Sequence, residues 1–459
     1  MAEELKPDLC IIGAGSGGLS LAAGAVQMGA SVVLIEGHKM GGDCLNYGCV
    51  PSKALLGAGR MVPPLSYADA QAHVRATIEK IEPHDSQDRF EGLGVTVLRD
   101  WARFTSPRTV EAGGRTIRAR RFVIATGSRP FVPPIDGLED VPYLTNETIF
   151  DLAEKPDHLI IIGGGPIGME MAQAHRQLGC EVTVIEGAKA LGRDDPDMAE
   201  IVVQHLRGQG ITLHENTSAQ AVTRSADGKI TVETGQGPIT GSHLLIAVGR
   251  KVNLAQLDLD TAGVEHTGKG VTVGANLRSV SNRRVYAIGD AAGGLHFTHV
   301  AGYHAGVVIR SILLGLPAKA RTDHIPWVTY TEPELAHVGM SEADARAKYG
   351  GAVEVITQPF AGMDRAIATG QTEGLAKVIV HQGRPVGATI AGPQAGELIG
   401  IWALAIANSL KISAVANTVL PYPSLGEINK RLAGSYFSPR LFESAMVKRV
   451  VRTVQRFLP

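Results

Sequence analysis

Two stretches of the chain repeat the same order of apolar and polar positions. In residues 8–36 an apolar strand (Asp8–Ile12) leads into a glycine-rich turn, a helix-compatible stretch follows, and a second apolar strand ends on Glu36. Residues 158–186 repeat this order 150 positions later and end on Glu186. An apolar strand, a glycine turn, a helix and a second strand predict a βαβ unit, so we expect two of them.

The glycines in both turns have the spacing of a dinucleotide-binding fingerprint. They are Gly13, Gly15 and Gly18 in the first unit and Gly163, Gly165 and Gly168 in the second. One glycine allows the tight turn, one lets the backbone approach a pyrophosphate, and one lets helix and strand pack closely. The pyrophosphate would lie at the helix N-terminus, where free N–H groups favour anions. Two βαβ units without a ligand are the alternative, but each copy has an acid 23 residues after its first glycine.

The acid that ends each second strand bears on which nucleotide is bound. Glu36 and Glu186 are placed to accept hydrogen bonds from a ribose. A carboxylate at residue 186 suits the free 2′-hydroxyl of NAD and repels the 2′-phosphate of NADP. The next residues offer Lys189 and Arg193 but no adjacent arginine pair. We therefore expect NAD in the second unit, with NADP as the less favoured choice.

Length and composition narrow the class of protein. A chain of 459 residues suggests about three domains. A net charge of −1 gives no reason to expect nucleic acid or a membrane as a partner. The chain has no apolar run of about 18 residues, and its acidic start lacks the basic region of a signal peptide. We expect a cytoplasmic protein.

A cysteine pair separates the two predicted binding units. Cys44 and Cys49 lie in GGDCLNYGCVPSKALL, where the residues after Gly48 indicate a helix start. A helix N-terminus lowers the pKa of a thiol, and Lys53 would lie one turn further on the same face. A metal site, a structural disulfide and two buried reduced thiols remain the alternatives. Cys10 and Cys180 lie in or beside apolar strands, and we expect both in the core.

The cysteine segment closely resembles the active-site segment of the pyridine nucleotide–disulfide oxidoreductases, which include dihydrolipoamide dehydrogenase, glutathione reductase and mercuric reductase. The resemblance covers nearly the whole chain. Further motifs that carry it are ATGSRP at 125–130, GGGPIGME at 163–170, AVGR at 247–250, AIGD at 287–290 and TYTEPELAHVG at 329–339. Their order and spacing together are more specific than any one of them.

The resemblance implies an α/β fold with two Rossmann-like dinucleotide-binding domains, for FAD and NAD, plus an α+β C-terminal dimerisation domain. It implies an FAD-binding domain first part at 1–150, an NAD(P)-binding domain at 151–270, a central part of the FAD-binding domain at 271–335 and an interface domain at 336–459. The expected partners are a small-molecule or protein-bound disulfide and a second copy of the chain, with active sites shared across the homodimer interface.

The resemblance also implies roles for single residues. Cys49 would be the thiolate beside the flavin and Cys44 the interchange thiol that attacks substrate. Lys53 would pair with Glu170 near the flavin N5. His299 would lie under the flavin, either in a direct role or as a structural histidine. The remaining expected contacts to FAD are Gly42, Ala102, Thr126, Gly127 and Asp290, and those to the nicotinamide nucleotide are Gly249 and Arg250.

One position departs from the family pattern. Disulfide reductases of this family carry a histidine five residues before a glutamate, and this chain has Tyr422 before Glu427. Tyrosine has an ordinary pKa near 10 and histidine near 6.5, so Tyr422 is the poorer proton carrier at neutral pH. Mercuric reductases share the tyrosine but also carry a C-terminal cysteine pair, and this sequence has no cysteine after Cys180.

We therefore expect an FAD- and NAD(P)-dependent oxidoreductase that passes electrons through the Cys44–Cys49 disulfide to a disulfide-type acceptor, as dihydrolipoamide dehydrogenase does. The alternative is a mercuric-reductase-like or diaphorase-type reductase of metal ions, quinones or reactive oxidants. A third hypothesis is a redox-sensing or scaffold protein that binds FAD but turns over little. No bound metal is expected.

Overall fold

The computed structural model describes residues 4–458, and residue contacts divide the chain into two compact units. The first unit combines the chain up to Lys189 with Ile211–Arg321, and the second combines Ala190–Gly210 with the chain from Thr322 onward. Both glycine-rich turns and the cysteine pair belong to the first unit. Tyr422 and Glu427 belong to the second.

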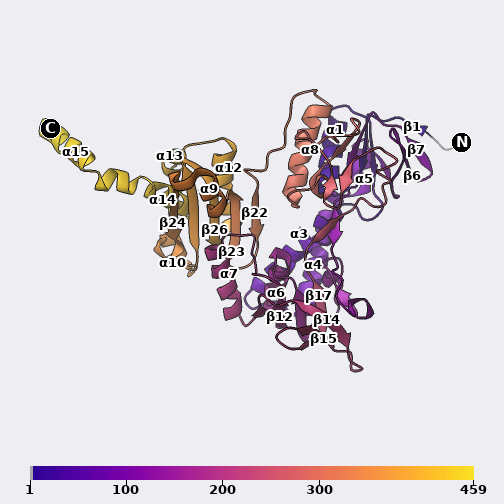
Figure 1. Ribbon diagram of the computed structural model, residues 1–459, viewed down its shortest axis with the longest axis horizontal. Helices are drawn as coiled ribbons and strands as arrows, with labels where there is room; N and C mark the ends of the chain where they lie inside the picture. Colours follow the sequence, from indigo (N-terminus) through magenta and orange to yellow (C-terminus); the bar gives the residue numbers. More distant parts are fainter. Residues whose placement is uncertain (1–3, 459) are drawn as a thin grey trace. The chain divides into compact units, whose positions relative to one another are not determined.

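The first glycine turn follows a strand of a parallel sheet. In spatial order the strands are β21 (Val285–Ala287), β8 (Arg121–Ile124), β2 (Leu9–Ile12), β3 (Val32–Ile35) and β4 (Thr96–Leu98). Side chains alternate between the faces of a strand. Leu9 and Ile11 therefore pack against α1 (Ser16–Gln27) and α8 (Thr298–Ile312), which lie side by side (Figure 1).

The opposite face of this sheet packs on a smaller sheet. Cys10 and Ile12 share a buried cluster with Phe104 and Val110 of that smaller sheet. Its strands are β1 (Glu4–Leu5), β7 (Arg115–Ile117), β6 (Thr109–Ala112) and β5 (Arg103–Ser106). The burial of Cys10 is the core position expected from the sequence.

The second glycine turn belongs to another parallel sheet in the same unit. Its strands are β10 (Tyr143–Leu144), β17 (His243–Ile246), β11 (His158–Ile162), β12 (Glu181–Ile185) and β13 (Thr212–His214). The helix α6 (Pro166–Gln177) contacts β11 and β12. Ile160 and Ile162 pack against an antiparallel sheet made of β14 (Ala219–Arg224), β15 (Ile230–Thr234) and β16 (Ile239–Gly241).

Short elements join the two parallel sheets of the first unit. The strand β9 (Ser128–Pro130) follows β8, and it pairs antiparallel with β18 (Arg250–Val252), which follows β17. The helix α3 (Cys49–Arg60) packs against α6 and against α4 (Tyr67–Ile81). The other short elements are α2 (Gly42–Asn46), α5 (Gln87–Gly92), β19 (His266–Thr267) and β20 (Gly270–Val271).

The second unit is built on an antiparallel sheet. Its strands are β22 (Pro326–Thr329), β23 (Glu334–Gly339), β26 (Arg384–Gly392), β25 (Leu375–His381) and β24 (Val353–Pro359). Trp402, Ile428 and Leu432 are buried in the core that covers this sheet. The helices are α7 (Pro196–Gly208), α9 (Glu342–Tyr349), α10 (Asp364–Ala368), α11 (Ala395–Leu398), α12 (Gly400–Ala407), α13 (Ile412–Ala416), α14 (Glu427–Ser435) and α15 (Ala445–Phe457).

The helix α7 lies between β12 and β13 in the sequence, yet it packs on β23 and β26 of the second unit. A buried ion pair fixes it there, because Lys377 Nζ donates hydrogen bonds of 2.8 and 2.9 Å to the carboxylate of Asp195, the N-cap residue of α7. The fold is the α/β arrangement expected from the sequence, with two Rossmann-like sheets and a separate α+β domain. Within residues 4–458 no helix is long and apolar enough to cross a membrane.

Candidate redox site

The two cysteines of the predicted redox pair lie close together at the start of α3. Cys44 is part of the short helix α2, and Cys49 is the first residue of α3, as the sequence indicated. Their thiols hydrogen-bond each other, and the Cys49 Sγ also lies 3.3 Å from Thr298 Oγ1, at the first residue of α8. Four residues separate the cysteines in the chain, so one turn between two short helices brings the thiols into contact.

The surroundings of the two thiols shift their pKa values in opposite directions. The hydrogen bond from Cys44 lowers the pKa of Cys49 to about 6, and the Thr298 hydroxyl and the Lys53 charge act in the same direction. The same hydrogen bond and burial raise the pKa of Cys44 far above its ordinary value. The reduced pair therefore holds one thiolate, on Cys49, while Cys44 keeps its proton. A thiolate is the reactive form of cysteine in redox chemistry.

Lys53 links the cysteine helix to the second nucleotide-binding sheet. Its Nζ donates a 2.7 Å hydrogen bond to Glu170 Oε2, and this joins α3 to α6. The Glu170 side chain is 6% exposed and that of Lys53 is 36% exposed. Because an unpaired buried carboxylate is costly, the ion pair holds the Lys53 ammonium one turn below Cys49.

A chain of polar contacts joins Asp43, the residue before Cys44, to Asp290. Arg250 Nη2 lies 3.1 Å from Asp43 Oδ1, and its Nε donates a 2.7 Å hydrogen bond to Ser128 Oγ. Ser128 Oγ in turn donates a 2.5 Å hydrogen bond to Asp290 Oδ2. From the sequence, Arg250 was expected to contact the nicotinamide nucleotide. The structure joins it to the segment that carries Cys44.

The first glycine turn packs backbone closely against backbone at the N-terminus of α1. A Cβ on Gly18 would stand 1.9 Å from the Gly13 carbonyl oxygen, so only glycine lets α1 pack this closely on β2. Gly15, the N-cap of α1, approaches Gly42, where a Cβ would come within 2.7 Å of the Gly15 Cα. Glu36 accepts hydrogen bonds from the backbone N–H groups of Ala14 and His38, at 2.6 and 2.8 Å.

The second turn repeats this geometry almost atom for atom. A Cβ on Gly168 would again stand 1.9 Å from the carbonyl oxygen of Gly163, and no atom lies within 4 Å of the Cβ position on Gly165. Glu186 accepts from the N–H groups of Gly164 and Ala188 at 2.6 and 2.9 Å. A carboxylate has about four acceptor sites, so Glu186 retains capacity for a ribose hydroxyl.

The other residues expected to contact FAD or the nucleotide lie around these turns. The buried Thr126 hydroxyl has no hydrogen-bond partner among the described residues. Such an orphaned hydroxyl fits a polar ligand at the end of β8. Gly127 and Gly249 adopt left-handed backbone with open space at the Cβ position. Ala102 is buried in the core beside the first sheet.

Glu427 is the first residue of α14 in the second unit, and Tyr422 lies in the segment before that helix. No hydrogen bond joins the two within residues 4–458. The Tyr422 hydroxyl instead donates a 2.6 Å hydrogen bond to Asp364 Oδ2, which raises the pKa of Tyr422. The buried Oε2 of Glu427 has no partner among the described residues. Tyr422 is thus held as a proton donor, which agrees with its expected weakness as a base.

Sequence reasoning missed three residues of this site. Thr298 contacts Cys49, Asp43 pairs with Arg250, and the buried His304 accepts a 3.2 Å hydrogen bond from the Gly289 N–H in the AIGD segment. Burial lowers the pKa of His304, so its ring is neutral and free to accept at Nδ1. Only Asp43 carried a local signal, since it stands beside Cys44 in the motif.

The other cysteines and the expected histidine have surroundings of their own. Cys180 is buried, and burial raises its pKa to about 11, so it is an unreactive core thiol. The His299 ring stacks on Phe297 with ring centres 5.4 Å apart. Over the described range, no group of three or more His, Cys, Asp and Glu side chains is placed to hold a metal ion.

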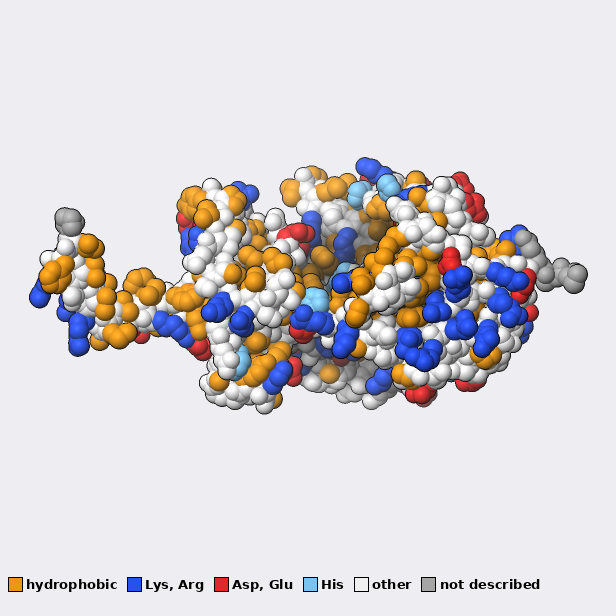
Figure 2. All heavy atoms as spheres, turned by 90° about the horizontal axis from the view of Figure 1, so that it is seen from above, with side chains coloured by type: hydrophobic (Ala, Val, Ile, Leu, Met, Phe, Trp, Pro, Cys, Tyr) orange, Lys and Arg blue, Asp and Glu red, His pale blue; other side chains and the backbone are white. Residues whose placement is uncertain are grey.

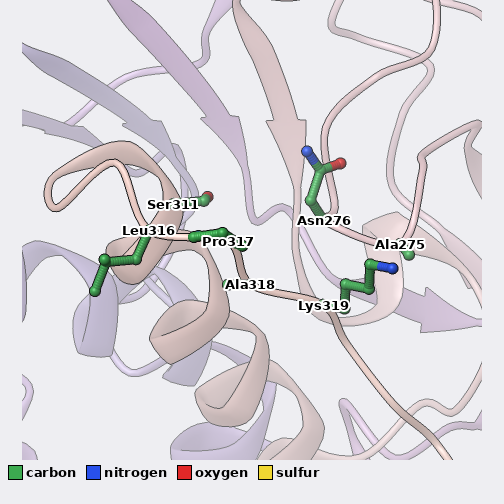
Figure 3. Close-up of a pocket in the computed structure, with 7 residues that line it drawn as sticks. All are labelled: Ala275, Asn276, Ser311, Leu316, Pro317, Ala318 and Lys319. Carbon is green, nitrogen blue, oxygen red and sulfur yellow. The ribbon is translucent and has the colours of Figure 1, made fainter.

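A separate cavity in the first unit is built from none of the predicted site residues. It measures about 320 Å³, and its lining is mostly apolar. Figure 3 shows the lining residues, which come from the loop before β21, the end of α8 and the segment after it: Ala275, Asn276, Ser311, Leu316, Pro317, Ala318 and Lys319. We assign no part of the redox chemistry to this cavity.

Two dinucleotide-binding turns around a polarised dithiol define a nicotinamide- and flavin-dependent oxidoreductase. The chain belongs to the pyridine nucleotide-disulphide oxidoreductase family. The sequence pattern of that family matches residues 7–305, and the pattern of the family's dimerisation domain matches residues 325–433. It is an enzyme of the class I group and uses FAD and NAD(P)H. The fold, the enzyme class and the cofactors expected from the sequence are confirmed.

Several known proteins are similar to this chain over most of its length. A mercuric reductase from Lysinibacillus sphaericus is 34% identical, over 93% of this chain and 82% of that protein. A mercuric reductase from Streptomyces lividans is 32% identical, over 94% of this chain and 96% of that protein. The Cu(II) complex of the HOCl-induced flavoprotein disulfide reductase RclA from Escherichia coli has a TM-score of 0.87 and 28% identity, and covers 94% of this chain and 99% of that one.

Proposed function

We propose that this enzyme passes electrons from NADH, through FAD, to the Cys44–Cys49 pair, and that the reduced pair reduces a thiol-reactive acceptor. The observation that carries the proposal is the polarised dithiol, with a thiolate on Cys49 and a protonated Cys44. FAD, when bound, relays two electrons between the nicotinamide ring and the disulfide. Reduction breaks the S–S bond, leaves Cys49 as the thiolate, and places a proton on Cys44.

The residues around the pair have separate tasks in this scheme. Cys49 would face the flavin and Lys53 would place a positive charge near it, while Glu170 holds Lys53 in position. Cys44 is the interchange thiol that meets the acceptor. When two electrons leave for the acceptor, the S–S bond forms again and the Cys44 proton is released. FAD would lie against Gly13, Gly15, Gly18, Glu36, Gly42, Ala102, Thr126, Gly127 and Asp290.

For the acceptor, we propose a soft metal ion or a reactive oxidant ahead of a disulfide. A disulfide acceptor forms a mixed disulfide, and its thiolate leaving group needs a proton carrier. Tyr422 is a poor carrier because its bond to Asp364 raises its pKa. The mercuric reductases and the Cu(II) complex of RclA among similar proteins support the same choice. Reducing two Cu(II) ions to Cu(I), for example, would consume the two electrons of one dithiol.

The acceptor is tested by steady-state NADH oxidation with Cu(II), Hg(II), lipoamide and glutathione disulfide. We expect turnover with the metal ions to exceed turnover with either disulfide, and Tyr422→His to raise disulfide turnover by up to about 10²-fold. Faster lipoamide turnover by the unaltered enzyme would refute the acceptor assignment and favour the dihydrolipoamide-dehydrogenase-like function.

The relay through the dithiol is tested separately with Cys44→Ser. We expect this variant to lose turnover with every thiol-reactive acceptor while it still reduces a dye that takes electrons directly from the flavin. The dye reaction is the control for folding and cofactor binding. A variant that keeps full metal turnover would show that the flavin alone is the donor.

We further propose NADH over NADPH as the reductant, because Glu186, which follows the second strand of this unit, would meet the ribose and repel a 2′-phosphate. Lys189, a nearby cation, is paired with Glu215 at 3.6 Å. Gly163, Gly165, Gly168, Gly249 and Arg250 would surround the nucleotide, within residues 151–270. The ratio of kcat/KM for NADH to that for NADPH tests this, and a value below one would contradict it.

Finally, we propose a homodimer in which Glu427 of each subunit serves the other subunit's cysteine pair. The dimerisation domain at residues 325–433 supports the dimer, and the unpartnered Glu427 Oε2 fits a carboxylate completed by another chain. In this assignment residues 1–150 and 271–335 hold FAD and residues 336–459 form the subunit contact. We place the enzyme in the cytoplasm, where NADH is supplied. Sedimentation of the purified protein gives the subunit number.

A further inference from the structure

The last helix of the chain has a feature that the redox chemistry does not use. At 3.6 residues per turn, the side chains of α15 separate into two faces. The apolar face consists of Met446, Val447, Val450, Val451, Val454 and Phe457. The opposite face carries Lys448, Arg449, Arg452 and Arg456. No cation lies within the apolar arc, and the small side chain of Ala445 is the one apolar group within the cationic arc.

Both faces of α15 are open within the second unit. None of its residues is buried, and Met446, Val450 and Phe457 are 74%, 54% and 81% exposed. Leu441 and Phe442, which precede the helix, are exposed as well. In Figure 2 the C-terminal segment, at the left, shows hydrophobic and basic side chains together. A folded chain rarely leaves so many large apolar groups without a surface to cover them.

The charges on α15 indicate what kind of surface this helix can bind. The helix α15 contains no acidic residue, and the nearest acidic residue before it is Glu443. Within residues 4–458, none of its four cations forms an ion pair. Four cations opposite an apolar face fit a surface that is both negatively charged and apolar beneath its polar layer. The helix also lies outside the dimerisation-domain match, which ends at residue 433.

We propose that α15 binds the surface of an anionic phospholipid bilayer. A helix of this kind lies in the plane of the interface, with its apolar face among the acyl chains and its Lys and Arg side chains at the lipid phosphates. Basic residues strengthen such binding through the negative surface potential. The enzyme would thus work at a membrane surface. This departs from the expectation drawn from the net charge, since an average over 459 residues hides a local cluster of four cations.

The test is flotation of the full-length, FAD-loaded enzyme with two kinds of vesicle. We expect it to float with vesicles of phosphatidylcholine and phosphatidylglycerol in equal parts, and to stay behind with vesicles of phosphatidylcholine alone. Added salt should weaken the binding. No flotation with the anionic vesicles would overturn the proposal.

Matched variants show whether vesicle binding depends on the two faces of α15 or only on the total charge of the protein. Lys448→Glu with Arg452→Glu should weaken binding at least about tenfold. Val450→Ser with Phe457→Ser should weaken it without any change of charge. The control, Arg108→Glu with Lys269→Glu, makes the same charge change at exposed positions outside α15 and should bind like the unaltered enzyme. An equal loss in the control would overturn the proposal.

A subunit contact is the competing explanation, and sedimentation without lipid distinguishes it. We expect each α15 variant to keep the oligomeric state and the NADH oxidation rate of the unaltered enzyme, because α15 contributes no buried residue. Variants that dissociate into monomers would show that α15 covers another copy of the chain instead of a membrane.

Discussion

At the scale of single residues, the chemistry depends on the difference between two neighbouring thiols. Cys49 sits at a helix N-terminus, accepts a hydrogen bond from Cys44 and lies near Thr298 and Lys53. Cys44 has the proton because its partner holds the charge. This division matches an electron path that enters at Cys49 and leaves at Cys44, so groups that shift either pKa should alter the rate.

Thr298→Val should raise the pKa of Cys49. It removes a hydroxyl that stabilises the thiolate from 3.3 Å away, and a hydrogen bond to a charged group contributes about 1.5–3 kcal/mol, or about 1–2 pKa units. The thiolate absorbance of the two-electron-reduced enzyme, followed against pH, measures the shift. Thr298→Ser keeps the hydroxyl and is the control. An unchanged titration in the valine variant would contradict this role.

Asp43→Asn and Arg250→Met should move the pKa of Cys49 in opposite directions. The Asp43 charge raises the pKa of both thiols, so its removal should lower that of Cys49. Loss of Arg250 leaves the Asp43 charge unpaired and should raise it. The same absorbance titration measures both. Shifts of the same sign would show that the pair affects the thiols through structure instead of charge.

At the scale of elements, the two glycine turns are built alike, and the glycines within a turn differ in the space around them. Gly18 and Gly168 let a helix pack against its strand, whereas Gly165 faces open space. The sequence predicted both turns because each lies within about 30 consecutive residues. It could not predict the contact of Thr298 with Cys49 or the pairing of Arg250 with Asp43, because the residues of each pair are about 200 or more positions apart in the chain.

Gly168→Ala and Gly165→Ala should therefore have different effects. The first puts a Cβ 1.9 Å from the Gly163 oxygen and should lower the free energy of unfolding by about 1–3 kcal/mol. The second meets no atom within 4 Å and should leave stability unchanged while it raises KM for NADH. Thermal unfolding and steady-state kinetics measure the two effects. Equal destabilisation by both would contradict the assigned roles.

At the scale of the whole molecule, the chain joins two nucleotide-binding sheets in one unit to a dimerisation domain in the other. Family motifs spread along the sequence were enough to predict this architecture. They did not predict that α7 packs on the second unit, because a buried pair between Lys377 and Asp195 decides it. Nor did they predict that Tyr422 bonds Asp364, a residue 58 positions earlier.

The central claim, a flavin in redox contact with a dithiol, is tested by anaerobic titration of the oxidised enzyme with NADH, followed by visible absorption. We predict a long-wavelength charge-transfer band between the Cys49 thiolate and the flavin after two electrons. The band should be absent in Cys49→Ser and should fade as the pH falls through about 6, where the thiolate gains a proton. A flavin that bleaches without this band at a pH well above 6 would contradict the account.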